Sequence, residues 1–148
     1  MTSPTVRRLI KDLEQSTFQT QPVENDLYTW VALVDGPKGT PFEGGFFSLV
    51  LLFDDEYPQH PPEVAFVSEV FHPNVYENGD ICLDILKNKW LPSYSVNSLL
   101  LSIQTLLGEP NENSPANAEA AELYVKNKEE YEKRVRKCVE ATWENINI

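Results

Sequence analysis

The sequence has few cysteines and no long hydrophobic run. Two cysteines among 148 residues cannot build a disulfide framework, and they indicate a reduced, intracellular chain. No apolar run approaches the ~18 residues that a membrane span needs, and the first residues do not form a signal peptide. We therefore expect a cytoplasmic or nuclear protein that neither enters a membrane nor is secreted.

Basic residues are also scarce. The chain has 12 Lys and Arg against 23 Asp and Glu, a formal charge of −11, which argues against direct nucleic-acid binding. Three bases and no acid fall in residues 1–11, whereas residues 12–86 hold fourteen acids and one base. This negative stretch is either a solvated surface or a field that steers a basic partner.

One domain spanning residues 1–148, without long extensions, fits the length and the absence of repeats or linkers. Ser3-Pro4 predicts the start of a helix. Apolar residues then recur at helical spacing, and the bases fall largely off that stripe, which predicts an exposed basic side. The apolar positions are Val6, Leu9, Ile10 and Leu13, and the bases are Arg7, Arg8 and Lys11.

The rest of the chain predicts an α+β fold. Residues 27–34, 46–53 and 64–67 are strand candidates, and their short connections favour an antiparallel meander. Residues 68–95 lack periodicity, and long irregular segments are often functional. Helices follow over 95–108, with Ser95 as cap and Gly108 as end, over 118–127, and from 129 onward, where Tyr131, Val135, Cys138, Val139, Thr142 and Ile146 share a face.

The two cysteines have different surroundings. Cys138 lies on the apolar stripe of the last helix and is expected to pack there. Cys82 lies in the irregular segment, where it is either a thiol buried among Ile81, Leu83 and Ile85 or a reactive group.

A metal site at Cys82 is excluded because no second cysteine is near and His60 and His72 lack ligand spacing. Asp80 and Asp84 flank the thiol, and negative neighbours raise a thiol pKa, which does not suit a protease nucleophile. If Cys82 is reactive, it should act as an acceptor and carrier.

Several motifs resemble the ubiquitin-conjugating enzymes. They are His72-Pro73-Asn74, Asn78-Gly79, Ile81-Cys82-Leu83-Asp84-Ile85-Leu86 and Trp90, together with Tyr57-Pro58-Gln59-His60-Pro61-Pro62, Gly36-Pro37, Thr40-Pro41-Phe42-Glu43-Gly44-Gly45, Glu109-Pro110-Asn111 and Ser114-Pro115. The match covers nearly the whole chain in order. Residues 71–76, 114–117 and 131–135 are most similar to the branch that acts in DNA repair and histone modification.

The resemblance implies a fold and a reaction. The fold is an N-terminal helix, a four-stranded antiparallel sheet and three further helices. In the reaction, Cys82 accepts ubiquitin from the activating enzyme as a thioester, and a ligase, expected to be of the RING type, promotes its transfer to a substrate lysine. No metal or other cofactor is implied. A carrier of another ubiquitin-like modifier, or a non-catalytic ubiquitin-binding variant, are the alternatives.

The resemblance also implies roles for single residues. Asn74 would hold the loop and stabilise the oxyanion when lysine attacks, or it is a turn asparagine that bonds its own backbone. His72 would tie the loop together. Asp84 would orient the incoming lysine and favour its deprotonation, or it only solvates an exposed turn.

Ser114 matches a position at the mouth of the active site, where many members carry an acid. It is a gate residue, a phosphorylation site that restores charge, or a helix cap before Pro115. The resemblance assigns the activating enzyme to the first helix, and the ligase to that helix with two loops. The residues of this partner surface are Arg7, Arg8, Lys11, Gln59, Leu91, Pro92 and Ser93.

Overall fold

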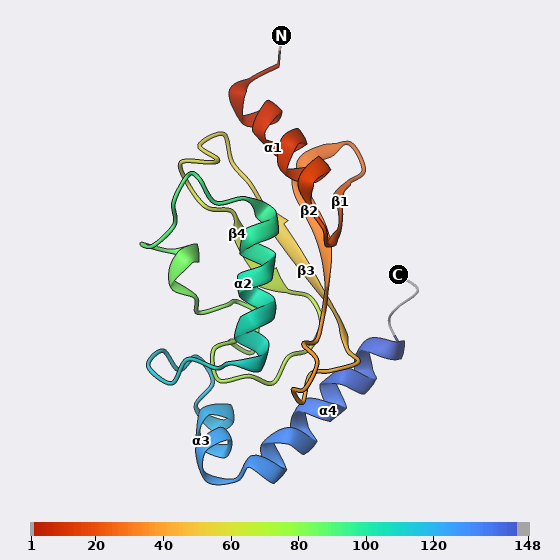
Figure 1. The fold of residues 1–148 in the computed structure, drawn as a ribbon, viewed down its shortest axis with the longest axis vertical. Helices are drawn as coiled ribbons and strands as arrows, with labels where there is room; N and C mark the ends of the chain where they lie inside the picture. Colours follow the sequence, from red (N-terminus) through yellow and green to blue (C-terminus); the bar gives the residue numbers. More distant parts are fainter. Residues whose placement is uncertain (1, 145–148) are drawn as a thin grey trace.

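The helices and strands follow one another in the order that the α+β prediction requires (Figure 1). The computed structural model describes residues 2–144. In chain order its elements are α1 (Pro4–Gln15), β1 (Gln19–Val23), β2 (Asp26–Asp35), β3 (Phe46–Leu52), β4 (Glu63–Phe66), the 3-10 turn η1 (Asp84–Leu86), α2 (Val96–Gly108), α3 (Ala118–Lys126) and α4 (Lys128–Glu144).

The four strands form one antiparallel meander in the order β1-β2-β3-β4. The predicted strands 27–34, 46–53 and 64–67 correspond to β2, β3 and β4, with ends that differ by at most one residue. Alternate residues of β3 (Phe47, Leu49 and Leu51) are fully buried, as one face of a half-covered sheet requires.

β1 is the strand that the residue pattern does not predict, although the resemblance implies it. Its sequence Gln-Thr-Gln-Pro-Val has no apolar alternation because it is an edge strand with three of its five residues exposed and none buried. Pro22 lacks an N–H donor, and an edge position tolerates this.

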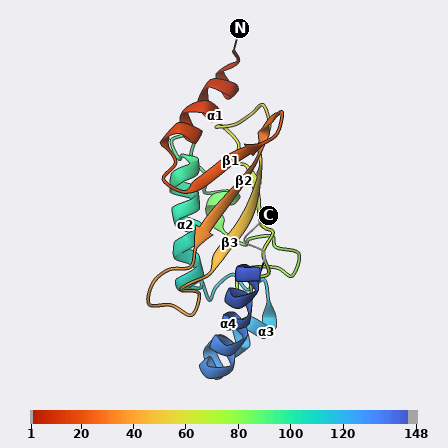
Figure 2. The ribbon, with the colours of Figure 1, turned by 90° about the vertical axis from the view of Figure 1, so that its right-hand side faces the viewer.

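α2 packs against one face of the sheet, between α1 at one end of the molecule and α3 and α4 at the other (Figure 2). Its start is fixed by a capping box in which Ser95 and Ser98 bond each other's backbone N–H. Six of its apolar residues are buried: Val96, Leu99, Leu100, Ile103, Leu106 and Leu107. The predicted helix over 95–108 is confirmed, and it is the central buried helix of the fold.

α1 begins as predicted, since the Ser3 hydroxyl accepts a hydrogen bond from the N–H of Val6 at 3.1 Å and Pro4 opens the helix. Arg7 and Lys11 are exposed. The prediction of an exposed basic side is wrong for Arg8, which turns inward because its guanidinium bonds Asp12 and the backbone oxygen of Tyr94.

The predicted face of α4 is confirmed over the described residues. Tyr131, Val135, Cys138, Val139 and Thr142 are buried, whereas Ile146 lies outside the part of the chain that the structure describes. α3 begins at Ala118 with Asn117 as its cap, whose side chain accepts from the N–H of Ala120.

Residues 68–95 are largely irregular, as predicted. A tight turn at Gly79 joins this segment to β4 by a hydrogen bond. The N–H of Phe66 donates to the oxygen of Gly79 at 2.8 Å. Gly79 has φ +96°, and a Cβ there would lie 2.1 Å from the oxygen of Phe66. Only glycine allows this close approach, which fixes where the chain enters the segment around Cys82.

None of the helices among residues 2–144 is long and apolar enough to cross a membrane.

Candidate active site

Cys82 lies at the surface directly after the bridge that pairs Val75 with Ile81. Its N–H donates to the backbone oxygen of Asn74 at 2.8 Å, so the two predicted site residues lie side by side. The Cys82 side chain is partly exposed, whereas Cys138 is buried, and burial raises the pKa of the Cys138 thiol. The structure thus separates a packed cysteine from an accessible one.

The Asn74 side chain is fully buried, and both ends of its amide are used. Nδ2 donates to the backbone oxygens of Asn111 (2.8 Å) and Ser114 (2.7 Å), and Oδ1 accepts from the N–H of Asn111 (2.8 Å). The alternative of a turn asparagine that bonds its own backbone is wrong, since the partners lie 37 and 40 residues away. The amide ties the segment before Cys82 to the loop after α2.

His72 anchors the same segment to the core. Its ring is completely buried, with Nε2 2.6 Å from the backbone oxygen of Leu106 and Nδ1 accepting from the N–H of Asn74. These partners require the neutral ring with its proton on Nε2. Burial lowers the pKa of His72 to about 4.

The low pKa of His72 predicts that acid destabilises the fold. The unfolded chain binds a proton at this ring below pH ~6.5, and the folded chain does so only below about 4. Acidification therefore favours unfolding over this window. We expect the free energy of unfolding, measured by urea titration, to fall by about 2 kcal/mol between pH 7 and pH 5.

His60 offers a matched control because it is exposed. A His60→Gln variant should keep the same slope. A wild-type stability that is constant over this range would contradict a buried neutral His72.

Asp84 is exposed and begins η1, the turn that follows Cys82. Its backbone oxygen accepts from the N–H groups of Lys87 (2.9 Å) and Lys89 (3.1 Å). This turn brings the Lys87 ammonium to 3.8 Å from the Cys82 sulfur, a contact that the sequence did not reveal. The thiol therefore has a cation beside it as well as the two acids seen in the sequence.

Ser114 is half-buried, and its backbone oxygen accepts a hydrogen bond from Asn74. The alternative in which Ser114 caps a helix is wrong, because Asn117 caps α3. The loop is also fixed to the His72 segment by Pro73, whose oxygen accepts from the N–H of Ala116 at 2.7 Å. Ser114 thus belongs to the loop that borders the site.

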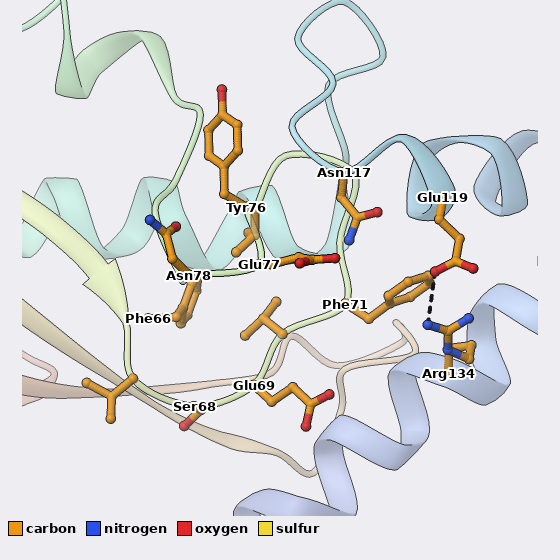
Figure 3. A pocket seen from close by; sticks show the side chains of 14 residues that line it. Phe66, Ser68, Glu69, Phe71, Tyr76, Glu77, Asn78, Asn117, Glu119 and Arg134 are labelled. Atoms are coloured by element: carbon orange, nitrogen blue, oxygen red, sulfur yellow. Dashed lines mark hydrogen bonds and ion pairs between the residues drawn. The ribbon is translucent and has the colours of Figure 1, made fainter.

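A recess of about 460 Å³ lies between the chain around residues 66–79 and the helices α3 and α4 (Figure 3). Glu119 and Arg134 form an ion pair of 3.2 Å across one side of it, and Arg134 also lies over the ring of Phe71. Glu69 and Glu77 make the recess acidic. Cys82 is not among the residues that line this recess.

The comparisons with known proteins agree with this geometry. Residues 5–139 match the family model described as "Ubiquitin-conjugating enzyme". The chain is 52% identical over 152 residues to "Ubiquitin-conjugating enzyme E2 1" of Caenorhabditis elegans, an alignment that covers 99% of this chain and 79% of the relative. It is 51% identical to "Ubiquitin-conjugating enzyme E2 2" of Mycosarcoma maydis (97% and 80% covered) and 48% identical to the protein of that name from Fusarium solani (98% and 100% covered).

The chain belongs to the ubiquitin-conjugating enzyme family. The helix, four-stranded sheet and three further helices that this family implied are those of the structure.

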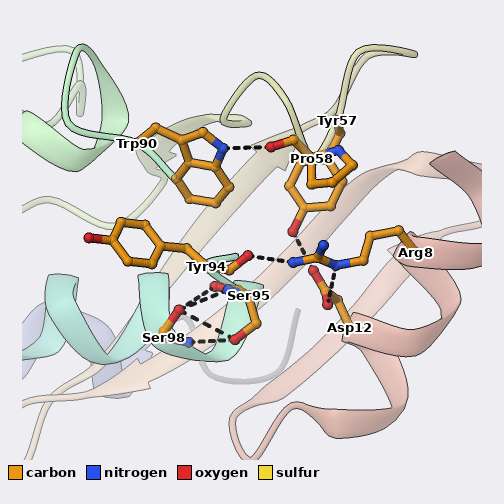
Figure 4. A network of polar contacts seen from close by, with 8 residues as sticks. All are labelled: Arg8, Asp12, Tyr57, Pro58, Trp90, Tyr94, Ser95 and Ser98. Carbon is orange, nitrogen blue, oxygen red and sulfur yellow. Dashed lines mark hydrogen bonds and ion pairs between the residues drawn. The ribbon is translucent and has the colours of Figure 1, made fainter. Parts of the chain in front are cut away.

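In this ubiquitin-conjugating enzyme, hydrogen bonds join the three segments of the predicted partner surface (Figure 4). Arg8 of α1 donates to the oxygen of Tyr94 at 2.6 Å, which holds the loop of Leu91, Pro92 and Ser93. Trp90 donates to the oxygen of Pro58 at 2.8 Å, which holds the loop that carries Gln59. Gln59, Leu91, Pro92 and Ser93 are exposed.

A buried acid, Asp12, joins α1 to the rest of this partner surface in the ubiquitin-conjugating enzyme. Asp12 is 2% exposed, and its carboxylate accepts from the guanidinium of Arg8 (3.1 Å) and from the hydroxyl of Tyr57. Burial, followed by the bond to Asp12, raises the pKa of Tyr57. Sequence reasoning missed Asp12, although an acid four residues after an arginine on one helix face is a signal for such a pair.

Within residues 2–144, the acids, histidines and cysteines do not gather in any group of three that could hold a metal ion.

Proposed function

We propose that this chain carries ubiquitin as a thioester on Cys82 and transfers it to lysine. The observation that supports this most strongly is the placement of Cys82, a partly exposed thiol held by a hydrogen bond to Asn74 within the motif that the family shares. The chain is then a transferase with a cysteine intermediate.

The loading step exchanges one thioester for another. The Cys82 sulfur attacks the carbonyl carbon of ubiquitin's C-terminus, which arrives as a thioester on the activating enzyme. A new carbon–sulfur bond forms at Cys82, the bond to the activating enzyme breaks, and the departing thiolate takes up the proton that the Cys82 thiol has lost. Bond types are conserved, so the step needs no cofactor from this chain.

In the transfer step, a lysine nitrogen attacks the same carbonyl carbon. An amide bond forms, the carbon–sulfur bond to Cys82 breaks, and the Cys82 thiolate takes up the proton that the nitrogen loses. Asp84 lies at the exposed start of η1, where its carboxylate orients the incoming lysine and, as a general base, relays the proton that the nitrogen loses. Asn74 donates an amide N–H to the oxyanion that forms, after it releases one of its two loop carbonyls. Ser114 supplies one of these carbonyls and so gates the site.

The partner surface supports two docking roles. Exposed Arg7 and Lys11 meet the activating enzyme, while Arg8 holds the surface from inside. A RING-type ligase contacts α1 together with Gln59 and the residues Leu91, Pro92 and Ser93. The likeness to the branch that acts in DNA repair and histone modification stays a prediction, as do the cytoplasmic or nuclear location and the single domain over 1–148.

A loading assay tests the function. The protein is incubated with activating enzyme, ATP and ubiquitin, and an adduct that a reducing agent destroys is expected. Cys82→Ala should form no adduct, whereas Cys82→Ser should form an oxyester that resists thiol. Cys138→Ala is the matched control and should load like wild type because Cys138 is buried in α4.

Loading of Cys82→Ala, or no loading of wild type, would overturn the proposal. Loading of a different ubiquitin-like protein in place of ubiquitin would keep the thioester but change the modifier.

A further inference from the structure

The recess of about 460 Å³ beside α3 and α4 combines an apolar lining with exposed carboxylates (Figure 3). Phe66 and Phe71, both buried, contribute to the apolar part of the lining. Glu69 and Glu77 also line the recess, and both of these acids are exposed. A side chain with an apolar stem and a positive head would therefore find both of its parts matched here.

A second recess, of about 620 Å³, extends the first one toward the active site. The two share Glu77, Asn117 and Glu119 among their lining residues, and the second adds Asp80, which lies two positions before Cys82. Figure 3 shows Glu77 reaching across the first recess toward Asn117. The shared lining makes the two recesses one acidic groove, which leads from α4 to the neighbourhood of the thiol.

Arg134 shows how this groove holds a guanidinium group. It is the one base among the lining residues of the two recesses, beside four acids. Its guanidinium lies 4.2 Å from the centre of the Phe71 ring and 3.2 Å from a carboxylate oxygen of Glu119. An aromatic face and a carboxylate are the two partners that arginine binds best.

The same pair of partners is still available nearer to Cys82. None of the ion pairs within residues 2–144 includes Glu69 or Glu77. Tyr76 lines both recesses, and its side chain is exposed. A second guanidinium, supplied by another protein, would meet an aromatic ring and unpaired carboxylates.

We propose that the acidic groove binds an arginine of the protein substrate near the lysine that receives ubiquitin, an inference that rests on the proposed function. The guanidinium pairs with Glu77 and Glu69, and its stem packs on the apolar lining. Because the groove ends beside Asp80, the bound segment is held close to the thioester on Cys82. The groove thereby favours substrate lysines that have an arginine nearby.

Peptide acceptors test the inference. The full chain is loaded with ubiquitin, ATP is removed, and the thioester is discharged to peptides that contain one lysine. Within the series, one arginine stands at increasing distances before or after that lysine. In each matched peptide, citrulline replaces the arginine, which keeps its shape but removes its charge.

We expect the best arginine peptide, at low concentration, to accept ubiquitin about fivefold faster than its citrulline partner, the factor of one partly exposed ion pair. Added salt should narrow the difference, because salt screens exposed charges.

Variants of the groove locate the effect. Glu77→Gln keeps the size of the side chain but removes its charge, and we expect the ratio of the two rates to fall toward one, further still when Glu69→Gln is added. This ratio cancels any general change in the rate of transfer. Glu24→Gln is the matched control, because Glu24 is an exposed acid between β1 and β2 that does not line the groove. It should keep the wild-type ratio.

The outcomes are distinct. A thioester that discharges equally to arginine and citrulline peptides, or a preference that persists when Glu69 and Glu77 are both replaced, overturns the role of the groove and leaves the proposed function standing. Failure to form any thioester overturns the proposed function, and the role of the groove with it.

Discussion

An Asn74→Ala variant is expected to pass ubiquitin from Cys82 to free lysine about 10²–10³-fold more slowly than wild type, while it still loads ubiquitin. This is the size of effect seen when one donor to an oxyanion is removed. The amide that would supply the donor now bonds the oxygens of Asn111 and Ser114, so the loop must release it during transfer. Discharge of preformed thioester with free lysine measures the rate.

The same variant loses stability, and the two effects must be separated. Removing the amide leaves buried carbonyls without a donor, which costs about 1–3 kcal/mol. Asn111→Ala is the matched control, because Asn111 contacts Asn74 only through its backbone. It should keep near-normal transfer. If Asn74→Ala discharges to lysine at the wild-type rate, Asn74 has a purely structural role.

An Asp12→Ala variant is expected to lower the free energy of unfolding by about 3–5 kcal/mol. Asp12 is almost fully buried, and its loss leaves the Arg8 guanidinium without its carboxylate and the Tyr57 hydroxyl without its acceptor. Removing one partner of a buried charged pair typically costs this much. Urea titration at pH 7 measures it.

Two comparisons sharpen this result. Glu14→Ala replaces an acid on the exposed side of the same helix and should change stability by no more than about 0.5 kcal/mol. Asp12→Asn keeps an acceptor for Tyr57 and should lose less than Asp12→Ala. A loss below 1 kcal/mol for Asp12→Ala would show that the network contributes little to the fold.

Local patterns predicted the elements whose signals are local. Ser95 caps α2 and the apolar repeat marks its buried side because both depend on residues within one or two turns. The residue pattern did not predict β1 because an edge strand needs no apolar alternation. Arg8 was assigned to the surface because its position on the helix cannot reveal the Asp12 carboxylate and the Tyr94 carbonyl that it bonds.

The features of the active site likewise fall into those that sequence motifs reveal and those that depend on tertiary contacts. The motifs around Cys82 could be recognised from the sequence, but the partners of Asn74 lie 37 and 40 residues away and depend on how the loop after α2 folds back. Lys87 reaches the thiol through a three-residue 3-10 turn, an element too short to have a periodic signal. Contacts made by tertiary folding were thus the part that the sequence could not provide.

The turn at Gly79 also protects the molecule from self-association. β4 is a short edge strand whose free backbone groups would otherwise invite pairing with a second chain. The bridge from Ala65 to Asp80, with the bond from the N–H of Phe66 to the oxygen of Gly79, covers part of that edge. At the opposite edge, Pro22 removes a donor from β1. Neither edge of the sheet therefore exposes a long row of free N–H and C=O groups. This disfavours edge-to-edge aggregation in a protein that must meet several partners.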